Sequence, residues 1–367
     1  MSDADRLEEV VALSLFMLLP KMQPDNRTTL IYMVVGLILG RNVQLAKIAE
    51  QVNYAYKESS LEDRFRRFVV NKNVEVVVTF SIFIKLMLRG LDEGQPVVLS
   101  IDSSKTGGNC LTLMVSLSYK SRALPLCWVT FKGRKGHSSQ EVQLTLLKAV
   151  KTLVADQPQV IVLGDGEFDG SQVVTWLEAQ PGWQYVCRTA NDVRVYHQGQ
   201  WLALKDLPLK PGQETFLAQL KFTESQVVEP VNILVVWRGS EKRHWFFVTN
   251  MPTQKEAKYW YRQRFKIETL FSDIKGRGFK IDKSRLKDPA RVNRLLLAVA
   301  IAYIFVVFWG VDAILSGTIR HMIRTDRFEH SLFTLGFKYI HRLLKKCLPI
   351  PPLLALPPPS SFAHVVL

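Results

Sequence analysis

Residues 97–102 read Val-Val-Leu-Ser-Ile-Asp, a short apolar run typical of a buried β-strand, and this run ends on a carboxylate. Two more strand-like segments follow at residues 111–119, where apolar residues alternate with period two, and at residues 125–131. Gly107 and Gly108 mark the first turn. Because short turns join antiparallel neighbours, these segments predict three consecutive antiparallel strands.

Helices and strands alternate after these three strands. The pattern predicts a helix over about 140–154 that is capped by Ser139, a buried strand at 160–165, a helix over about 171–179 and a strand at 185–189. Three antiparallel strands joined to strand–helix units form a mixed sheet with helices on its faces. This order predicts an α/β fold with a ribonuclease-H-like mixed sheet.

The segments on either side of this core differ from it in composition. Residues 1–90 show helical spacing of apolar residues, residues 191–250 carry strand-like runs between glycines, and helical spacing returns afterwards. Six prolines between Pro349 and Pro359 exclude a helix at the end of the chain and predict a loose tail. The predicted division is 1–90, helical; 91–190, first part of the core; 191–250, β-rich insertion; 251–346, second part of the core with C-terminal helices; and 347–367, proline-rich tail.

The overall composition is that of a globular protein with an anionic partner. Of 367 residues, 47% are hydrophobic and 22% charged, which excludes a wholly disordered chain because so much apolar surface can be buried. Lys and Arg number 48 against 33 Asp and Glu, which gives a net charge of +15. A protein this basic usually binds nucleic acid or an acidic membrane surface.

The cysteines and the first residues favour a cytoplasmic location. The four cysteines include no close pair in sequence and the seven histidines form no ligand motif, which argues against a zinc site or a disulfide framework. The chain opens Met-Ser-Asp-Ala-Asp, which is acidic and unlike a secretory signal. We therefore expect a protein of a reducing compartment.

One apolar segment raises the question of a membrane. Residues 295–309 are an unbroken run of 15 apolar residues, whereas a spanning helix needs roughly 20. We expect a helix buried on all sides in a large core and no contact with a membrane. The alternative is a membrane protein anchored by residues 295–311.

Two carboxylates end neighbouring strands of the predicted sheet. Asp102 follows the first strand and Asp165 the fourth, and this strand order places those two strands side by side. Two carboxylates at such close range repel each other unless a cation lies between them, and their hard oxygen ligands suit Mg²⁺ or Mn²⁺. The alternative is that each Asp only forms a turn, which is common for this residue type.

A third carboxylate, Glu268, belongs to a segment of helical spacing. Counted from Tyr261, the residues Arg264, Glu268 and Lys275 lie 3, 7 and 14 positions on. At about 100° per residue these offsets fall at roughly −60°, −20° and −40°, so one continuous helix would hold all four side chains in a narrow stripe. Such a helix could hold Glu268 over the sheet edge, with Arg264 and Lys275 beside it to bind phosphates. The alternative is an exposed charged face that stabilises only the helix.

The charge of this segment argues against that alternative. Between Lys255 and Arg294 there are 13 Lys or Arg and five Asp or Glu, a net charge of +8 within 40 residues. A solvated helix face that only stabilises itself mixes both signs of charge. The excess of cations indicates a surface for a polyanion.

These motifs together resemble a known family. The spacing Tyr261-x2-Arg264-x3-Glu268-x6-Lys275 is similar to the Y-R-E-K signature of bacterial insertion-sequence transposases of the DDE class, and the chain resembles the insertion sequence four family. Ile101-Asp102-Ser103-Ser104 resembles the family's first-Asp motif. Residues 164–169 resemble the second, although Gly166 and Glu167 depart from its usual Asp-Arg-Gly-Phe form. The segments 245–250, 326–327 and 331–336 resemble further parts of the family, so the likeness covers about residues 45–345.

The resemblance implies a catalytic centre. Asp102, Asp165 and Glu268 would be the catalytic triad and would bind two Mg²⁺ (or Mn²⁺) ions, one activating a water or a DNA 3′-hydroxyl and the other stabilising the leaving oxygen. Tyr261, Arg264 and Lys275 would contact phosphates of the transposon end. Trp245 would stack on a base flipped from the duplex, or else would be an ordinary core tryptophan.

The resemblance also implies partners and leaves alternatives. The partner would be double-stranded DNA, both the terminal inverted repeats, recognised by the N-terminal helices, and the target DNA. The active form would be a homodimer on DNA in the bacterial cytoplasm, associated with the nucleoid. The basic loop Lys132–Lys135 with His137 would touch DNA or only be solvated. The alternatives are another ribonuclease-H-like DNA nuclease and a catalytically silent DNA-binding protein descended from a transposase.

Overall fold

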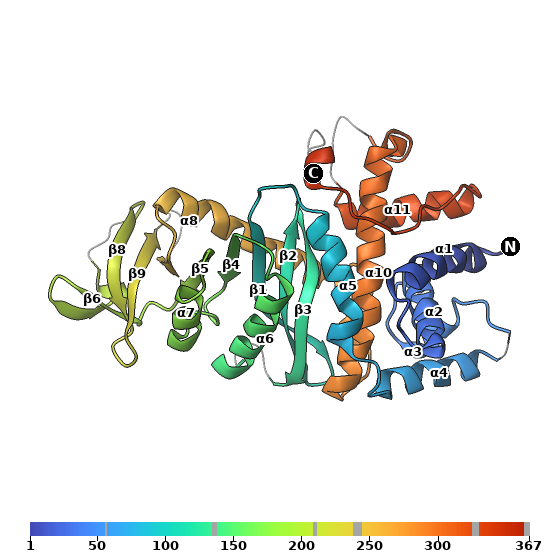
Figure 1. Cartoon of the computed structure of the whole chain (residues 1–367), viewed down its shortest axis with the longest axis horizontal. Helices are drawn as coiled ribbons and strands as arrows, with labels where there is room; N and C mark the ends of the chain where they lie inside the picture. Colours follow the sequence, from blue (N-terminus) through green and yellow to red (C-terminus); the bar gives the residue numbers. More distant parts are fainter. Residues whose placement is uncertain (56, 134–137, 208–210, 238–243, 325–329, 363–367) are drawn as a thin grey trace.

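The computed structural model describes residues 1–55, 57–133, 138–207, 211–237, 244–324 and 330–362. Within these residues, ten strands form one mixed sheet in the order β3-β2-β1-β4-β5-β10-β9-β8-β6-β7. Figure 1 shows this sheet beside a helical region that holds the N-terminal helices and α10. The strands are β1 (Val97–Gly107), β2 (Cys110–Tyr119), β3 (Arg122–Lys132), β4 (Val160–Gly164), β5 (Trp183–Thr189), β6 (Arg194–His197), β7 (Gln200–Ala203), β8 (Glu214–Phe222), β9 (Val228–Val236) and β10 (Trp245–Thr249). The helices are α1 (Asp3–Leu18), α2 (Pro24–Gly40), α3 (Leu45–Ala49), α4 (Glu58–Val70), α5 (Val76–Arg89), α6 (Gln140–Leu153), α7 (Ser171–Glu178), α8 (Gln254–Tyr261), α9 (Lys266–Ile274), α10 (Pro289–Leu315) and α11 (Leu332–Lys345).

The order of elements predicted for the centre of the chain is confirmed. β1, β2 and β3 pair antiparallel in sequence order, and α6, β4, α7 and β5 follow. β4 pairs parallel with both β1 and β5. The Ser139 side chain accepts a hydrogen bond from the backbone N–H of Val142 and so caps α6, as the sequence predicts. The result is a mixed α/β sheet with helices packed on it.

The two faces of the sheet contact different helices. Side chains alternate along each strand, so Leu99 and Ile101 of β1 lie in the main core with α6 and α7. Val98 lies instead in a second cluster that includes Ala257 of α8. Asp102 is four residues beyond Val98 and shares its face. The carboxylate therefore lies on the side of the sheet that α8 covers.

The β-rich segment after β5 extends the same sheet. β10 pairs antiparallel with β5, placing Phe247 opposite Arg188, and β9, β8, β6 and β7 continue the sheet outward. In Figure 1 these strands form the end of the sheet farthest from α10. The last strand of this insertion, β10, therefore pairs with β5, the neighbour of β4, and α8 begins directly after it.

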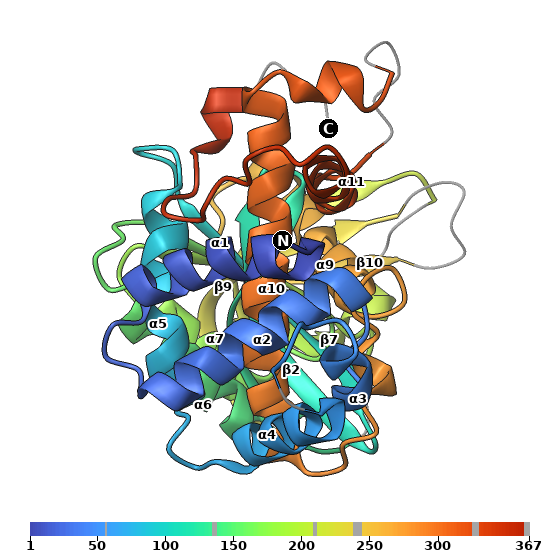
Figure 2. The ribbon, with the colours of Figure 1, turned by 90° about the vertical axis from the view of Figure 1, so that its right-hand side faces the viewer.

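The helical character predicted for residues 1–90 is confirmed by α1 to α5. Ser2 and Asp5 form a reciprocal capping box at the start of α1, and Pro24 begins α2. Figure 2 shows α1 to α4 in front of α10, and both α2 and α4 contact α10. These helices therefore pack on the same long helix that borders the sheet.

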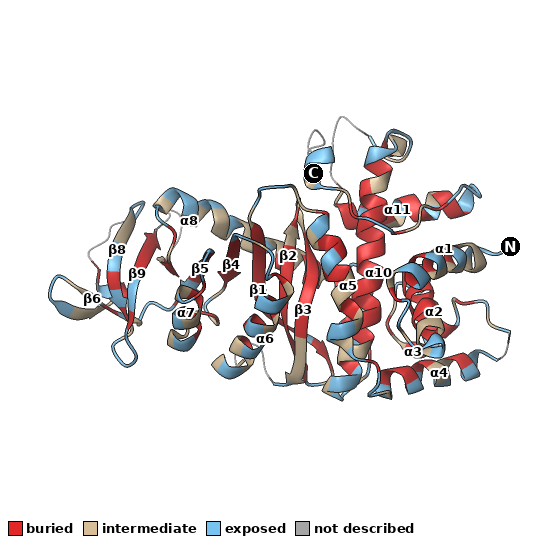
Figure 3. Ribbon diagram, in the orientation of Figure 1, coloured by how far each residue is buried: buried red, intermediate tan, exposed pale blue. Residues whose placement is uncertain are grey.

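α10 is the helix expected to be buried, and it forms the centre of the helical region. It contacts β3, α2, α4, α5 and α11, and Figure 3 shows it buried along most of its length. By length and composition it could cross a membrane, with mean hydropathy 2.3 over its most apolar 18-residue window, but 94% of that window is buried within the protein. Its close packing on α11 depends on Gly310 and Gly336, where a Cβ would lie 2.1 Å from Leu332 O and 1.8 Å from Val306 O, respectively.

The prediction that the proline-rich tail is loose is wrong for the residues that the structure describes. Leu353 and Phe362 are fully buried, and a short 3₁₀ turn covers Pro359–Phe362. Trp309 Nε1 donates a hydrogen bond to Pro351 O at 3.0 Å, and Leu353 N donates to Ser14 Oγ at 3.0 Å. Prolines exclude an α-helix but leave side chains and carbonyl groups able to pack, so the tail folds over the helical region.

Candidate active site at the junction of β1, β4 and α9

Asp102 and Asp165 lie where the parallel pairing of β1 and β4 stops. The last pair is Ile101 with Gly164, and the two acids are the next residues on the two chains. The predicted adjacency of these strands is confirmed. β1 itself continues to Gly107 as one arm of the hairpin with β2, so the prediction that Asp102 ends its strand is wrong. β1 can extend beyond the end of β4 because the edge of β1 that pairs with β2 forms its hydrogen bonds independently of the edge that pairs with β4.

Backbone amides hold both carboxylates in place. The N–H of Ser103 donates to Asp102 Oδ1 at 2.7 Å, and the N–H of Glu167 donates to Asp165 Oδ1 at 3.0 Å. Asp102 is buried, with 3% relative exposure, whereas Asp165 is half-buried. Hydrogen bonds of this kind, to a charged acceptor, are among the strong ones and fix the orientation of the oxygens.

The continuous helix predicted from Tyr261 to Lys275 is interrupted, and that prediction is wrong. α8 ends at Tyr261, a 3₁₀ turn covers Arg262–Phe265, α9 follows, and Lys275 lies just beyond its end. The backbone on both sides of the turn keeps right-handed helical angles. The predicted side chains therefore still reach the same part of the sheet, but through a tighter turn than a regular helix makes.

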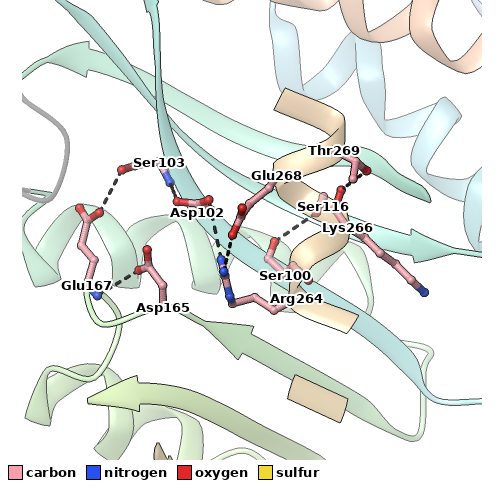
Figure 4. Close-up of polar contacts among 10 residues, drawn as sticks. All are labelled: Ser100, Asp102, Ser103, Ser116, Asp165, Glu167, Arg264, Lys266, Glu268 and Thr269. Atoms are coloured by element: carbon pink, nitrogen blue, oxygen red, sulfur yellow. Dashed lines mark hydrogen bonds and ion pairs between the residues drawn. The ribbon is translucent and has the colours of Figure 1, made fainter. Parts of the chain in front are cut away.

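Arg264 contacts two of the three acids (Figure 4). Its guanidinium forms an ion pair with Glu268, and Nη1 lies 3.9 Å from Asp102 Oδ2. The Arg264 side chain is 14% exposed and that of Glu268 40%. The guanidinium thus supplies positive charge between carboxylates that come from β1 and α9.

Lys275 and Tyr261 lie on either side of this cluster. The Lys275 ammonium donates a hydrogen bond to Ser104 Oγ, two residues beyond Asp102 on the same face of β1. The Tyr261 ring packs edge-on against Phe247 at 4.4 Å between centroids. Burial raises the pKa of Tyr261, so its hydroxyl stays protonated and can donate a hydrogen bond. The structure therefore brings all four residues of the predicted stripe to the sheet face that carries Asp102.

Trp245 begins β10 and is only partly buried. The guanidinium of Arg188, an exposed residue of β5, lies 4.8 Å from the centroid of its ring. A small hollow beside it is lined by Glu214, Leu234, Val236, Trp245, Phe247, Lys258, Tyr261 and Arg262. Trp245 is therefore neither a fully enclosed core residue nor an isolated surface ring.

A family model described as "Transposase DDE domain" matches residues 99–305, which is more than half of the chain. The chain belongs to the DDE transposase family. Asp102, Asp165 and Glu268 all lie within the matched residues. Domains of this family generally use divalent metal ions, in agreement with the ligand chemistry of the three acids.

Comparison with other proteins adds only a distant structural similarity. No curated protein matches the chain. Eight chains of solved structures are similar to it. One belongs to a cryo-EM structure of the piggyBac transposase synaptic complex with hairpin DNA, with a TM-score of 0.46 and 14% identity, covering 95% of this transposase and 80% of that chain.

Asp102, Asp165 and Glu268 suit a divalent cation, but their side chains are not positioned as a complete set of metal ligands. Within the described ranges, no group of three or more His, Cys, Asp or Glu side chains is arranged as a metal site. The three carboxylates nevertheless come from adjacent elements, and two of them, Asp102 and Glu268, form ion pairs with the guanidinium of Arg264. This donor set of hard oxygens fits Mg²⁺ or Mn²⁺.

Arg188 and Glu167 lie beside the acids, but the sequence gives little indication that either residue belongs to the site. Arg188 follows Cys187, the partner of Gly164, so it sits beside Asp165 across the sheet. Its only sequence signal is a basic residue near the end of a predicted strand. Glu167 stands out in the sequence only as a departure from the family motif, which assigns it no role. Three residues of the loop expected to touch DNA, Arg134, Lys135 and His137, lie outside the described residues, as do Asp326 and Arg327 of the segment that resembles the family's C-terminal region.

Proposed function

We propose that this chain is an insertion-sequence transposase of the Y-R-E-K type, similar to the insertion sequence four family, that cleaves DNA at transposon ends and transfers the 3′-hydroxyl ends into target DNA. The observation that carries the proposal is the convergence of Asp102, Asp165 and Glu268 beside β1, inside the matched transposase domain. The order β3-β2-β1-β4-β5, with β4 parallel to both neighbours, supports a ribonuclease-H-like core.

In this proposal the three acids hold two Mg²⁺ or Mn²⁺ ions. Bound divalent ions supply Lewis-acid polarisation of the scissile phosphate and a lowered pKa for the attacking oxygen. The protein's own part is to hold Asp102 and Asp165 with backbone amides and to keep Asp102 away from water. Glu268, with a side chain that is 40% exposed, has room to leave Arg264 and bind an ion.

The cations around the acids would bind the DNA backbone. Lys275 is held beside Asp102 through Ser104, so a phosphate positioned at the acids would meet its ammonium. Arg264 carries five N–H donors, so it can donate to a phosphate with those not directed at Glu268 and Asp102, or exchange one of these acids for the phosphate. The excess of 13 Lys or Arg over five Asp or Glu between residues 255 and 294 supplies sequence-independent attraction to DNA.

The remaining parts of the proposal concern the assembly. The N-terminal helices α1 to α5 would recognise terminal inverted repeats, and two chains would pair two transposon ends before joining. The transposase would act in the bacterial cytoplasm, at the nucleoid. Support for a DNA partner is the net charge of +15, which is large for a protein of this length.

Trp245 tests the base-stacking part of the proposal. Its partly exposed ring and the neighbouring Arg188 form a cationic aromatic surface, so we expect Trp245→Ala to weaken end cleavage by roughly 5- to 150-fold, the equivalent of the 1–3 kcal/mol of one base stack. Trp245→Phe should retain most of the activity. Trp201→Ala, which removes a partly buried tryptophan from the distant strand β7, is the matched control. Equal cleavage by Trp245→Ala and wild type would refute base stacking at this position.

The function as a whole is tested by cleavage of the DNA that flanks this gene. A labelled duplex containing the gene's inverted repeats is incubated with the full chain, with and without Mg²⁺, and the products are resolved on a sequencing gel. We expect metal-dependent 3′-hydroxyl ends at the repeat boundary. Cutting without preference for the repeat would favour a general nuclease, and binding with no cutting in Mg²⁺ or Mn²⁺ would favour a silent DNA-binding protein.

A further inference from the structure

Glu167, two residues after Asp165, connects Asp102 and Asp165 through hydrogen bonds (Figure 4). Its Oε2 accepts a hydrogen bond from Ser103 Oγ at 2.9 Å, and its backbone N–H donates to Asp165 Oδ1 at 3.0 Å. The backbone N–H of Ser103 donates to Asp102 Oδ1 at 2.7 Å. Three consecutive hydrogen bonds therefore run from one acid to the other through Glu167 and Ser103.

The other carboxylate oxygen of Glu167 binds the segment that leads into α6. Oε1 accepts hydrogen bonds from the backbone N–H of Ser138, at 2.8 Å, and from its hydroxyl. Gln143 of α6, with 1% relative exposure, donates from Nε2 to the carbonyl oxygens of Glu167, at 3.0 Å, and Ser138, at 3.1 Å. Glu167 thus joins β1, the loop after β4 and the start of α6 at one point.

The chemistry of this junction suits a side chain that only accepts hydrogen bonds. An ionised carboxylate has about four acceptor positions and no donor, and three donor groups face it here. Glutamine would keep an oxygen for the Ser138 N–H, and its amide could donate to the Ser103 hydroxyl, which can also accept. Alanine would leave every one of these donors without its partner.

We propose that Glu167 is a positioning residue of the metal centre, which holds Asp102 and Asp165 at a fixed spacing and orientation so that both can bind the same ion. The proposal rests on the proposed function, because the ion is the one that DNA cleavage would use. Residues that orient metal ligands through hydrogen bonds typically contribute about 10- to 100-fold to metal affinity. Glu167 acts through Ser103 and Asp165 and does not itself bind the ion.

The experiment measures Mn²⁺ binding and cleavage separately. Mn²⁺ is titrated into the full chain without DNA and followed by electron paramagnetic resonance, and the Mg²⁺ concentration for half-maximal cleavage of repeat DNA is measured in parallel. The variants are Glu167→Ala, Glu167→Gln and Ser103→Ala. The matched control is Glu178→Ala, which removes a half-buried carboxylate of α7 that accepts a hydrogen bond from Tyr185 at 2.7 Å, away from the acids.

We expect Glu167→Ala to weaken Mn²⁺ binding and to raise the half-maximal Mg²⁺ concentration by about 10- to 100-fold, with cleavage close to wild type at saturating metal. Ser103→Ala should show a smaller shift in the same direction, Glu167→Gln should resemble wild type, and metal-free DNA binding should be unchanged throughout. Unchanged metal affinity in Glu167→Ala, or equal losses in the Ala and Gln variants, would overturn the positioning role. If wild type bound Mn²⁺ but cut no DNA, the proposed function would fail while the binding comparison still decided the role of Glu167.

Discussion

Replacing Glu268 with Gln is expected to reduce metal-dependent cleavage by about 10³-fold or more while DNA binding is retained. Gln has the shape of Glu but no negative charge, so it removes one ligand charge from the proposed metal centre. A 10³-fold loss corresponds to about 4 kcal/mol of transition-state stabilisation, which is within the several kcal/mol that a catalytic metal ion supplies.

The fold should survive this substitution. The amide oxygen of the substituted side chain could still accept a hydrogen bond from Arg264, and the Glu268 side chain is 40% exposed, so little packing depends on it. The measurement is cleavage of labelled repeat DNA in Mg²⁺ alongside a binding titration without metal. Glu256→Gln, an exposed acid in the first turn of α8, is the control and should cut like wild type. Full cleavage by Glu268→Gln would remove this residue from the catalytic centre.

The second large effect is expected at the buried ion pair that fixes α9 to the sheet. Arg122 of β3 lies 3.0 Å from Asp273 Oδ2, with side-chain exposures of 12% and 2%, and the hydroxyl of Tyr303 on α10 lies 3.5 Å from the same oxygen. Burial raises the pKa of Asp273 to about 6, and the neighbouring Arg122 charge offsets part of this rise. At neutral pH the Asp273 carboxylate is therefore ionised, and Arg122 supplies the positive charge that compensates it in the buried site.

Asp273→Ala should lower the free energy of unfolding by about 3–5 kcal/mol, because it leaves the Arg122 charge buried without its partner. The double variant Arg122→Met with Asp273→Leu should recover most of this loss, since well-packed apolar pairs often replace buried ion pairs at little cost. Urea denaturation at neutral pH measures all three proteins. A loss below about 1 kcal/mol in Asp273→Ala would show that the pair behaves like an exposed one.

The sequence predicted the central sheet well because its signals are local. The apolar runs before Asp102 and Asp165 are direct consequences of strand burial. The alternation along residues 111–119 also marked a strand correctly, although its polar residues Thr112 and Ser116 are buried as well. Once the order of strands and helices is known, few arrangements remain, and the adjacency of β1 and β4 follows. The spacing of Arg264 and Glu268 then indicated which helical segment faces these strands.

The predictions that were wrong or incomplete concern features that depend on contacts between segments distant in the sequence. Nothing between residues 254 and 275 marks the 3₁₀ turn, since this stretch contains neither Gly nor Pro. The burial of Leu353 and Phe362 depends on a surface built by the helical region. The hydrogen bonds of Glu167 join residues up to 64 positions apart, so only the fold reveals them. Arg264 was expected to bind phosphates; its ion pair with Glu268 is local, but its approach to Asp102 depends on the fold, which brings β1 beside the turn before α9.

The central claim, that Asp102, Asp165 and Glu268 together form a divalent-metal centre, is tested most directly by locating the metal itself. Crystals of the full chain with repeat DNA are soaked in Mn²⁺, and anomalous diffraction is recorded at the manganese edge. We predict anomalous peaks in contact with carboxylate oxygens of all three acids, with Arg264 moved away from Glu268. Manganese bound elsewhere, with Arg264 still paired to Glu268 and Asp102, would contradict the account.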